Sequence, residues 1–358
     1  MSVYYLLFGC VFLLAFIPKK NMVWGKVAAL LLLFISMFRG INVGSDTINY
    51  YTNNFYDTFD IYSSRGYTFE FIFIFVSNLI HSLDLPPRFC LYFLSLVTFV
   101  FLDLSSRRYR VDFASVCFFF YLFNFYFLSL NISRQIAAIT ILLYAYSFLK
   151  DTAPKRYYFF FYVIVAAGIH ISSLLFMPVY LVTVLPYMKK NKAPVFRYLQ
   201  SIGLIILYVF FQFYGTQLQD TVFGISESLM LYNKYASQTE IASISFLGLF
   251  SNIVILIIDI IIYYTIKKKG YDMVARLFLI SVIVMIFLSS ITGNIGRLMW
   301  DIMIIKVIAY CYCFSKTIPK MKARELLFFL IAIFLNAYNV FYSINRGSYE
   351  IVPYYMTL

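Results

Sequence analysis

The sequence predicts an all-α fold: a polytopic membrane bundle of about twelve (11–14) transmembrane helices, in a single integral membrane domain over residues 1–358. Hydrophobic residues make up 62% of the chain and charged residues only 13%, whereas a soluble domain has about 25% charged residues. Apolar runs of about 17–25 residues recur, each long enough to cross a bilayer as a helix. Most lysines and arginines lie in short clusters between these runs. These observations exclude an ordinary soluble domain.

The basic clusters indicate the orientation of the chain. Lysine and arginine are enriched in cytoplasmic loops, so we expect all six clusters on the cytoplasmic side of the membrane. The net charge of +13 therefore reports topology and does not indicate nucleic acid binding. The clusters are residues 19–26, 107–110, 150–156, 189–197, 267–276 and 316–324.

The apolar runs between these clusters are the expected membrane spans. The first, "VYYLLFGCVFLLAFIP", has no basic region before it and no small-residue cleavage site after it, so we expect a retained span and not a signal peptide. Later runs form pairs that leave and re-enter the cytoplasmic side, and both chain ends are expected outside. The pairs are 112–130 with 134–149, 156–170 with 172–186, 197–214 with 242–264, and 274–291 with 298–314, followed by a last run near 325–343.

One region does not fit this alternation. An odd number of crossings is required between the external "NVGSDTINYY" and the internal "RRYR", yet two apolar runs are present, near 69–83 and 89–104. The first is short, opens with Glu70 and contains Asn78 and His81. We therefore expect a re-entrant or interfacial helix near 69–83 and a true span at 89–104.

The basic residues outside the clusters are candidates for substrate binding. Ionisable groups at membrane depth are costly and commonly mark substrate or ion pathways. Four arginines have polar companions and are expected at one external face, in "FRGINVGSDTINYY", "NISRQIAA", "TGNIGRLMWD" and "NRGSYE". An arginine fork suits a diphosphate, although each could equally snorkel or cap a helix. The eight basic residues outside the clusters are Arg39, Arg65, Arg88, Arg134, Lys234, Arg297, Lys306 and Arg346.

Candidate acids and bases lie near the same expected face. His170 follows one apolar run in "VIVAAGIHISSLLFMP", and an imidazole there could accept a proton from a sugar hydroxyl. It could also simply hold two helices together by hydrogen bonding. Asp46 and Glu70 are the alternative acids or bases, although "GSDT" also fits a turn.

Other notable residues have simpler interpretations. The cysteines, Cys10, Cys90, Cys117, Cys311 and Cys313, lie in apolar runs without metal-ligand spacing, so neither a disulfide framework nor a zinc site is expected. The charges in later apolar runs fit a structural ion pair involving Asp301 as well as a transport role; they are Asp259, Asp301 and Lys306.

Several of these segments together resemble a known family. The segments "FRGINVGSDTINYY", "RGYTFEFIF", "ISRQIAAITILLYAY", "AAGIHISSLLFMPVYL" and "GNIGRLMWD" are similar to the EpsG-like branch of bacterial Wzy-type O-antigen and exopolysaccharide polymerases. The resemblance covers residues 30–300 in order, with Ile169 where an aromatic residue is commoner. The family pattern falls on Arg39, Gly44, Ser45, Asp46, Tyr50, Glu70, Arg134, Gln135, Ala137, His170, Ser172, Ser173 and Arg297.

The resemblance implies a membrane glycosyltransferase with a GT-C-like bundle around a lipid-diphosphate cavity. It would transfer a growing glycan from undecaprenyl diphosphate onto an incoming lipid-linked repeat unit at the external face of a bacterial plasma membrane. His170, Asp46 and Glu70 would be catalytic, and no metal or cofactor is implied. The substrate-binding residues would be Arg39, Arg134, Gln135, Arg297 and Tyr50. The implied partners are lipid-linked repeat units and the bilayer, with a chain-length regulator as a further candidate.

Two other classes of protein also need a cationic membrane cavity. A lipid-linked oligosaccharide flippase should place charges midway through its spans and show repeat-related halves, and the sequence contains no internal repeat. An O-antigen ligase-like transferase should carry a larger external loop with its own histidine and arginines. The loop at about 215–241 contains neither residue type. The sequence therefore favours a polymerase over these alternatives.

Overall fold

The computed structural model describes residues 2–16, 22–44, 47–50, 70–152, 154–183, 201–210, 246–288, 297, 299–314, 321–345, 351 and 354. The fold is all-helical, and none of these residues lies in a β-strand. The chain divides into two compact units, residues 1–180 with 310–358 and residues 181–309. The expected single membrane domain stays a prediction.

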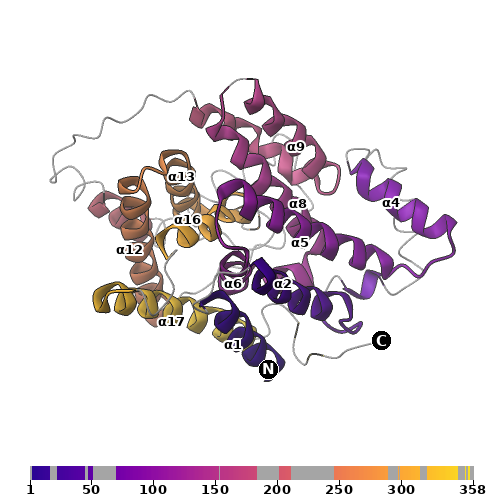
Figure 1. Cartoon of the computed structure of the whole chain (residues 1–358), viewed down its shortest axis with the longest axis horizontal. Coiled ribbons are helices and arrows are strands. Elements are labelled where there is room, and N and C mark those ends of the chain that lie inside the picture. Colours follow the sequence, from indigo (N-terminus) through magenta and orange to yellow (C-terminus); the bar gives the residue numbers. More distant parts are fainter. Residues whose placement is uncertain are drawn as a thin grey trace. The chain divides into compact units, whose positions relative to one another are not determined.

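The first unit is built around three consecutive helices whose side chains are almost all buried, α6 (Phe113–Leu122), α7 (Phe125–Asn131) and α8 (Ser133–Tyr146). Helices α1 (Ser2–Phe16) and α2 (Met22–Met37) pack on α6. Helices α5 (Phe89–Tyr109) and α9 (Tyr158–Ala167) pack on α8, and Figure 1 shows the three together. The remaining helices of this unit are η1 (Thr47–Tyr50), α4 (Phe71–Ser82), η2 (Ser147–Lys150), η3 (Lys155–Tyr157) and α17 (Ala323–Asn345).

The second unit contains α12 (Phe246–Lys268), α13 (Asp272–Leu288) and α15 (Met299–Met303). Helix α12 packs against α13, and α13 packs against α15. Two further helices cross the boundary between the units along the chain, η4 (Ile171–Thr183) and α16 (Ile305–Cys313).

Helix lengths identify the clearest membrane spans. Within the described residues, three helices are long and apolar enough to cross a membrane: α5, residues 250–268 of α12, and α17. They match the runs expected at 89–104, 242–264 and 325–343. The bent pair α6 and α7 could supply a fourth span. The expected count of about twelve spans is therefore not confirmed and stays a prediction.

Two expected spans differ from continuous α-helices. The run expected at 112–130 is broken into α6 and α7, which are bent by 68°. Asn124 sits at this break in the left-handed conformation, with φ of 74°, which asparagine adopts more readily than most residues. The run expected at 172–186 begins with the 3₁₀ helix η4, which contains Pro178. Proline lacks the amide that a regular α-helix requires at such an interior position.

Candidate active site

Glu70 immediately precedes α4, where an acidic side chain would ordinarily cap the helix. Its side chain makes no capping hydrogen bond. The carbonyl oxygen of Gly168 instead accepts from the first α4 amides, Ile72 N at 2.9 Å and Phe73 N at 3.0 Å. A Cβ atom on Gly168 would lie 2.8 Å from the Ile72 side chain, so a larger residue here would force that side chain to move. The end of α9 thus caps α4, and the Glu70 carboxylate is directed to other partners.

Those partners are the two candidate residues Arg134 and His170. Arg134 Nη1 lies 2.7 Å from one carboxylate oxygen of Glu70, and His170 Nδ1 lies 3.0 Å from the other. The amide of Ile171 donates to the same oxygen as His170, at 3.4 Å. The side chains of Glu70, Arg134 and His170 are 18%, 36% and 28% exposed, respectively. Three residues from separate segments therefore form one partly open cluster, which we call the Glu70 cluster.

The electrostatics of the cluster favour a charged carboxylate. Burial raises the pKa of Glu70, but the hydrogen bond from His170 and the charges of Arg134 and His170 together outweigh burial. The pKa of Glu70 therefore falls below its ordinary value. A carboxylate with a lowered pKa is a weak proton acceptor near neutral pH. It is better suited to orienting the imidazole and stabilising its positive charge.

Arg134 occupies the first turn of α8, a position that helix stability does not explain. The amide dipoles give a helix N-terminus partial positive charge, so a cation there is unfavourable. The guanidinium is held by Glu70 and lies over the Phe73 ring, 5.1 Å from its centroid. An arginine next to helix amides provides two features that proteins use to bind phosphate groups. Sequence reasoning assigned no role to Phe73, although it lies in the quoted segment "RGYTFEFIF".

Arg39 differs from Arg134 because it is fully buried, with 0% exposure. Its Nε donates to Thr47 Oγ1 at 3.0 Å, and its Nη1 donates to the Ser36 carbonyl oxygen at 2.9 Å. Its Nη2 donates to Ser133 Oγ at 2.7 Å. Of the polar residues in the segment "FRGINVGSDTINYY", Thr47 is thus a partner of the arginine itself. These contacts favour a role in holding Ser133, the residue before Arg134, over direct contact with diphosphate.

The turn after Arg39 packs against Leu130, three residues before Ser133. Gly44 has a φ of 87°, and a Cβ atom there would lie 2.0 Å from the Leu130 carbonyl oxygen. Thr47 Oγ1 also lies 3.3 Å from that oxygen. The segment around Arg39 and the start of α8 are therefore locked together by backbone contact and by buried hydrogen bonds. We call the contacts of Arg39, Gly44 and Thr47 with Leu130 and Ser133 the buried lock.

The other predicted site residues are not all brought to the cluster. Tyr50 is buried and packs edge-on against Phe73, with ring centroids 6.5 Å apart. Gln135 is buried in the first turn of α8. Arg297 is exposed and belongs to the second unit, so its expected place near Arg134 stays a prediction. The predictions for Asp46, Arg65, Lys234 and Arg346 lie outside the described residues.

An ion pair is present in the second unit. Lys306 Nζ lies 2.9 Å from Asp259 Oδ2, and both side chains are buried. Asp259 is therefore a partner of Lys306. The ion pair that the sequence suggested for Asp301, which is also buried, stays a prediction. All five cysteines are free. No group of three or more metal-ligating side chains occurs in the part of the chain that the structure describes.

Comparison with known proteins identifies a family. The model of the EpsG family matches residues 22–356, nearly the whole chain. No curated protein and no solved structure matches.

Proposed function

The chain belongs to the EpsG family of Wzy-type polymerases, and we propose that it polymerises a lipid-linked polysaccharide at the external membrane face, with the Glu70 cluster as its reaction centre. The donor would be a growing glycan on undecaprenyl diphosphate. The acceptor would be a sugar hydroxyl of an incoming lipid-linked repeat unit. The family match supports polysaccharide polymerisation in a membrane, and the chemistry of the site supports the finer assignment.

The contact of both His170 and Arg134 with one carboxylate carries this proposal. Glycosyl transfer from a lipid diphosphate needs a group that accepts a proton and a cation that stabilises the leaving group. The Glu70 cluster holds an imidazole and a guanidinium together, and each is more than a quarter exposed. A merely structural ion pair would not need the histidine.

His170 would act as the general base. Its Nδ1–H donates to Glu70, which leaves the lone pair on Nε2 to accept a proton. The acceptor hydroxyl oxygen forms a bond to the anomeric carbon as its proton moves to Nε2. The bond between that carbon and the diphosphate oxygen breaks, and the oxygen leaves with the electron pair. Glu70 stabilises the imidazolium that results.

Arg134 would bind the diphosphate and stabilise the charge that develops on the leaving oxygen. Arg297 would add a second cation, and Asp46 remains the alternative base. Arg39 would act indirectly, because the buried lock holds Ser133, the residue before Arg134. Tyr50 and Gln135 are buried, which supports a role in shaping the site.

The expected orientation agrees with the position of the site along the helices. Arg134 lies at the start of α8 and His170 just after α9. The basic clusters at 107–110 and 150–156 lie at the opposite ends of α5, α8 and α9. Since basic clusters favour the cytoplasm, the Glu70 cluster should face outside.

Deletion of the protein in its native host, followed by gel analysis of the surface glycan, tests the proposed function. Loss of a polymerase should collapse the ladder to a single repeat unit. Complete loss of repeat-bearing glycan would instead indicate a flippase or a ligase-like transferase, and the proposal would be wrong.

A further inference from the structure

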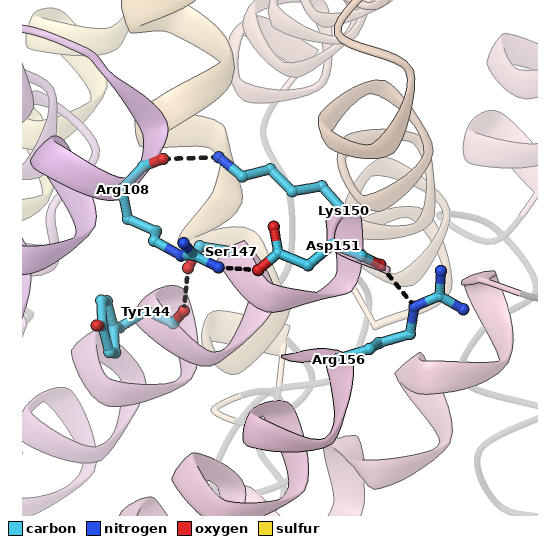
Figure 2. Close-up of polar contacts among 6 residues, drawn as sticks. All are labelled: Arg108, Tyr144, Ser147, Lys150, Asp151 and Arg156. Carbon is cyan, nitrogen blue, oxygen red and sulfur yellow. Dashed lines mark hydrogen bonds and ion pairs between the residues drawn. The ribbon is translucent and has the colours of Figure 1, made fainter. Parts of the chain in front are cut away.

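A second polar cluster lies at the opposite end of α8 and α9 from Glu70. Helix α8 has 14 residues and is about 21 Å long, with Arg134 at its start and Lys150 in the turn that follows its end. The cluster joins the end of α5, the turn η2 and the start of α9 (Figure 2).

Hydrogen bonds fix these three segments to one another. Arg108 pairs with the Asp151 carboxylate, and Lys150 Nζ donates to the Arg108 carbonyl oxygen at 2.6 Å (Figure 2). Arg156 Nε donates to the Asp151 carbonyl oxygen at 3.1 Å. The Arg108 guanidinium also lies 4.3 Å from the centroid of the Phe148 ring. These contacts hold the end of α5, the turn η2 and the start of α9 in a fixed arrangement, which we call the framework.

Positive charge exceeds negative charge on this framework. Its acids are already engaged: Asp103 pairs with Arg107, Asp112 accepts from the Ser115 amide, and Asp151 pairs with Arg108. Three exposed cations lie on the same segments, Arg110 at the end of α5, Lys150 in η2 and Lys155 in η3. Partial burial and the charges of Arg108 and Arg110 lower the pKa of Lys150. Crowded cations of this kind favour a bound anion.

The backbone at Arg110 gives an independent reason to expect a role for its charge. Arg110 ends α5 with a left-handed φ of 57°; its amide donates to the Arg107 carbonyl, and that of Val111 donates to the Ser106 carbonyl. Gly270, just after α12, has a φ of 88° and the same pattern. Its amide donates to the Lys267 carbonyl, and the amide of Tyr271 donates to the Ile266 carbonyl. Glycine adopts this conformation without strain, whereas arginine does not. The helix cap therefore does not explain why arginine occupies position 110.

The surface beside the cations is apolar. Helix α9 and the residue before it expose a stripe of large side chains at helical spacing: Tyr157, Tyr158, Phe161 and Ile164. Tyrosines at a helix end followed by apolar residues are typical of a membrane interface. The stripe begins next to Lys155, so a molecule held there would contact cationic and apolar groups together. A membrane lipid has both parts, whereas a soluble phosphate has only one.

We propose that Arg110, Lys150 and Lys155 form a binding site for the phosphate head group of an anionic membrane lipid, with its acyl chains against the exposed face of α9. The site lies at the end of the bundle expected in the cytoplasm, where anionic lipids attract basic residues. It is separate from the Glu70 cluster, and its existence does not require the proposed function.

Lipid binding to the purified full-length chain tests this site. The protein in neutral detergent is titrated with phosphatidylglycerol or phosphatidylcholine, and bound lipids are counted by native mass spectrometry. The wild type should prefer phosphatidylglycerol, and the preference should weaken as salt is raised. Arg110→Gly should lower phosphatidylglycerol affinity about fivefold, as expected for one interfacial charge. The double variant Lys150→Gln, Lys155→Gln should lower it further.

The variants are chosen so that misfolding cannot produce the result. Glycine suits the left-handed cap, so Arg110→Gly should unfold at or above the wild-type temperature. Lys268→Gln removes one exposed charge at the end of α12 and should leave lipid affinity unchanged. Wild-type affinity in both Arg110→Gly and the double variant would overturn the proposal. So would equal binding of phosphatidylcholine, or displacement of the lipid by millimolar inorganic phosphate.

Discussion

The Nδ1 atom of His170 lies 3.0 Å from a carboxylate oxygen of Glu70, although the two residues are one hundred positions apart in the chain. The contact forms because the carbonyl of Gly168 caps α4, which frees the Glu70 side chain from its usual capping role. The carboxylate fixes which ring nitrogen carries the proton. A histidine that the sequence left as either a base or a structural residue thereby acquires the geometry of an oriented base.

Arg134→Lys should impair use of the lipid-linked donor. Lysine keeps the charge but loses the planar fork that matches a diphosphate. A hydrogen bond to a charged group is worth about 1.5–3 kcal/mol, so the KM for the donor should rise at least about tenfold. Kinetics of the purified enzyme measure this. Arg107→Lys, at the opposite end of the bundle, is the matched control and should behave as wild type. A normal KM in Arg134→Lys would make Arg134 a structural residue.

Arg39→Lys should act mainly on stability. The Arg39 guanidinium is fully buried and donates from all three nitrogens, and a lysine ammonium cannot reach these acceptors in the same geometry. Each lost charged hydrogen bond should cost about 1.5–3 kcal/mol. Thermal unfolding in detergent should therefore show a clear drop for Arg39→Lys and little change for Arg134→Lys, whose side chain is 36% exposed. Equal unfolding temperatures would refute the buried lock.

Gly44→Ala should prevent correct folding of the first unit. The added Cβ would lie 2.0 Å from the Leu130 carbonyl oxygen, and the φ of 87° is itself unfavourable by about 1–2 kcal/mol for any other residue. Membrane levels of the variant should fall sharply. Gly9→Ala is the control, because nothing lies within 4 Å of its new Cβ and alanine favours a helix by about 0.5–1 kcal/mol. If both variants accumulate equally, the packing around Gly44 is wrong.

The Glu70 cluster should make stability depend on pH. Glu70 has a pKa below its ordinary value of 4.5, so its contribution is fully present above about pH 4.5. The contribution is lost as pH falls through the lower pKa of the folded state. Wild type should therefore unfold at a higher temperature than Glu70→Gln near neutral pH, and the difference should shrink below about pH 4.5. A difference between wild type and Glu70→Gln that stays constant as pH falls would contradict this role of the Glu70 carboxylate.

The sequence predicted the parts of the fold that depend on local pattern. The long helices α5, α12 and α17 fall close to the expected apolar runs, because continuous hydrophobicity and length determine them. The bend of 68° between α6 and α7 was missed. Its only signal was Asn124 inside an aromatic run, and a single residue of this kind does not reveal whether tertiary packing will use it to break the helix.

The site was only partly predictable for a related reason. Sequence reasoning selected Glu70, Arg134 and His170 separately, since each is a polar residue at the end of an apolar run. Their contact depends on three segments meeting in space, and no local pattern encodes that meeting. Arg39 is the opposite case. Its polar neighbours suggested a ligand site, which stays a prediction, and the structure shows that Thr47 and Ser133 accept hydrogen bonds from the arginine itself.

Polymerisation of lipid-linked repeat units by purified His170→Gln tests the central claim most directly. Glutamine keeps a polar side chain of similar reach but cannot accept and carry the proton. General-base catalysis is typically worth about 10²–10⁴-fold, so the rate should fall by that factor while the unfolding temperature stays near wild type. His81→Gln, which changes the exposed histidine at the end of α4, should polymerise normally. A near-wild-type rate for His170→Gln would contradict the account and make His170 a structural partner of Glu70.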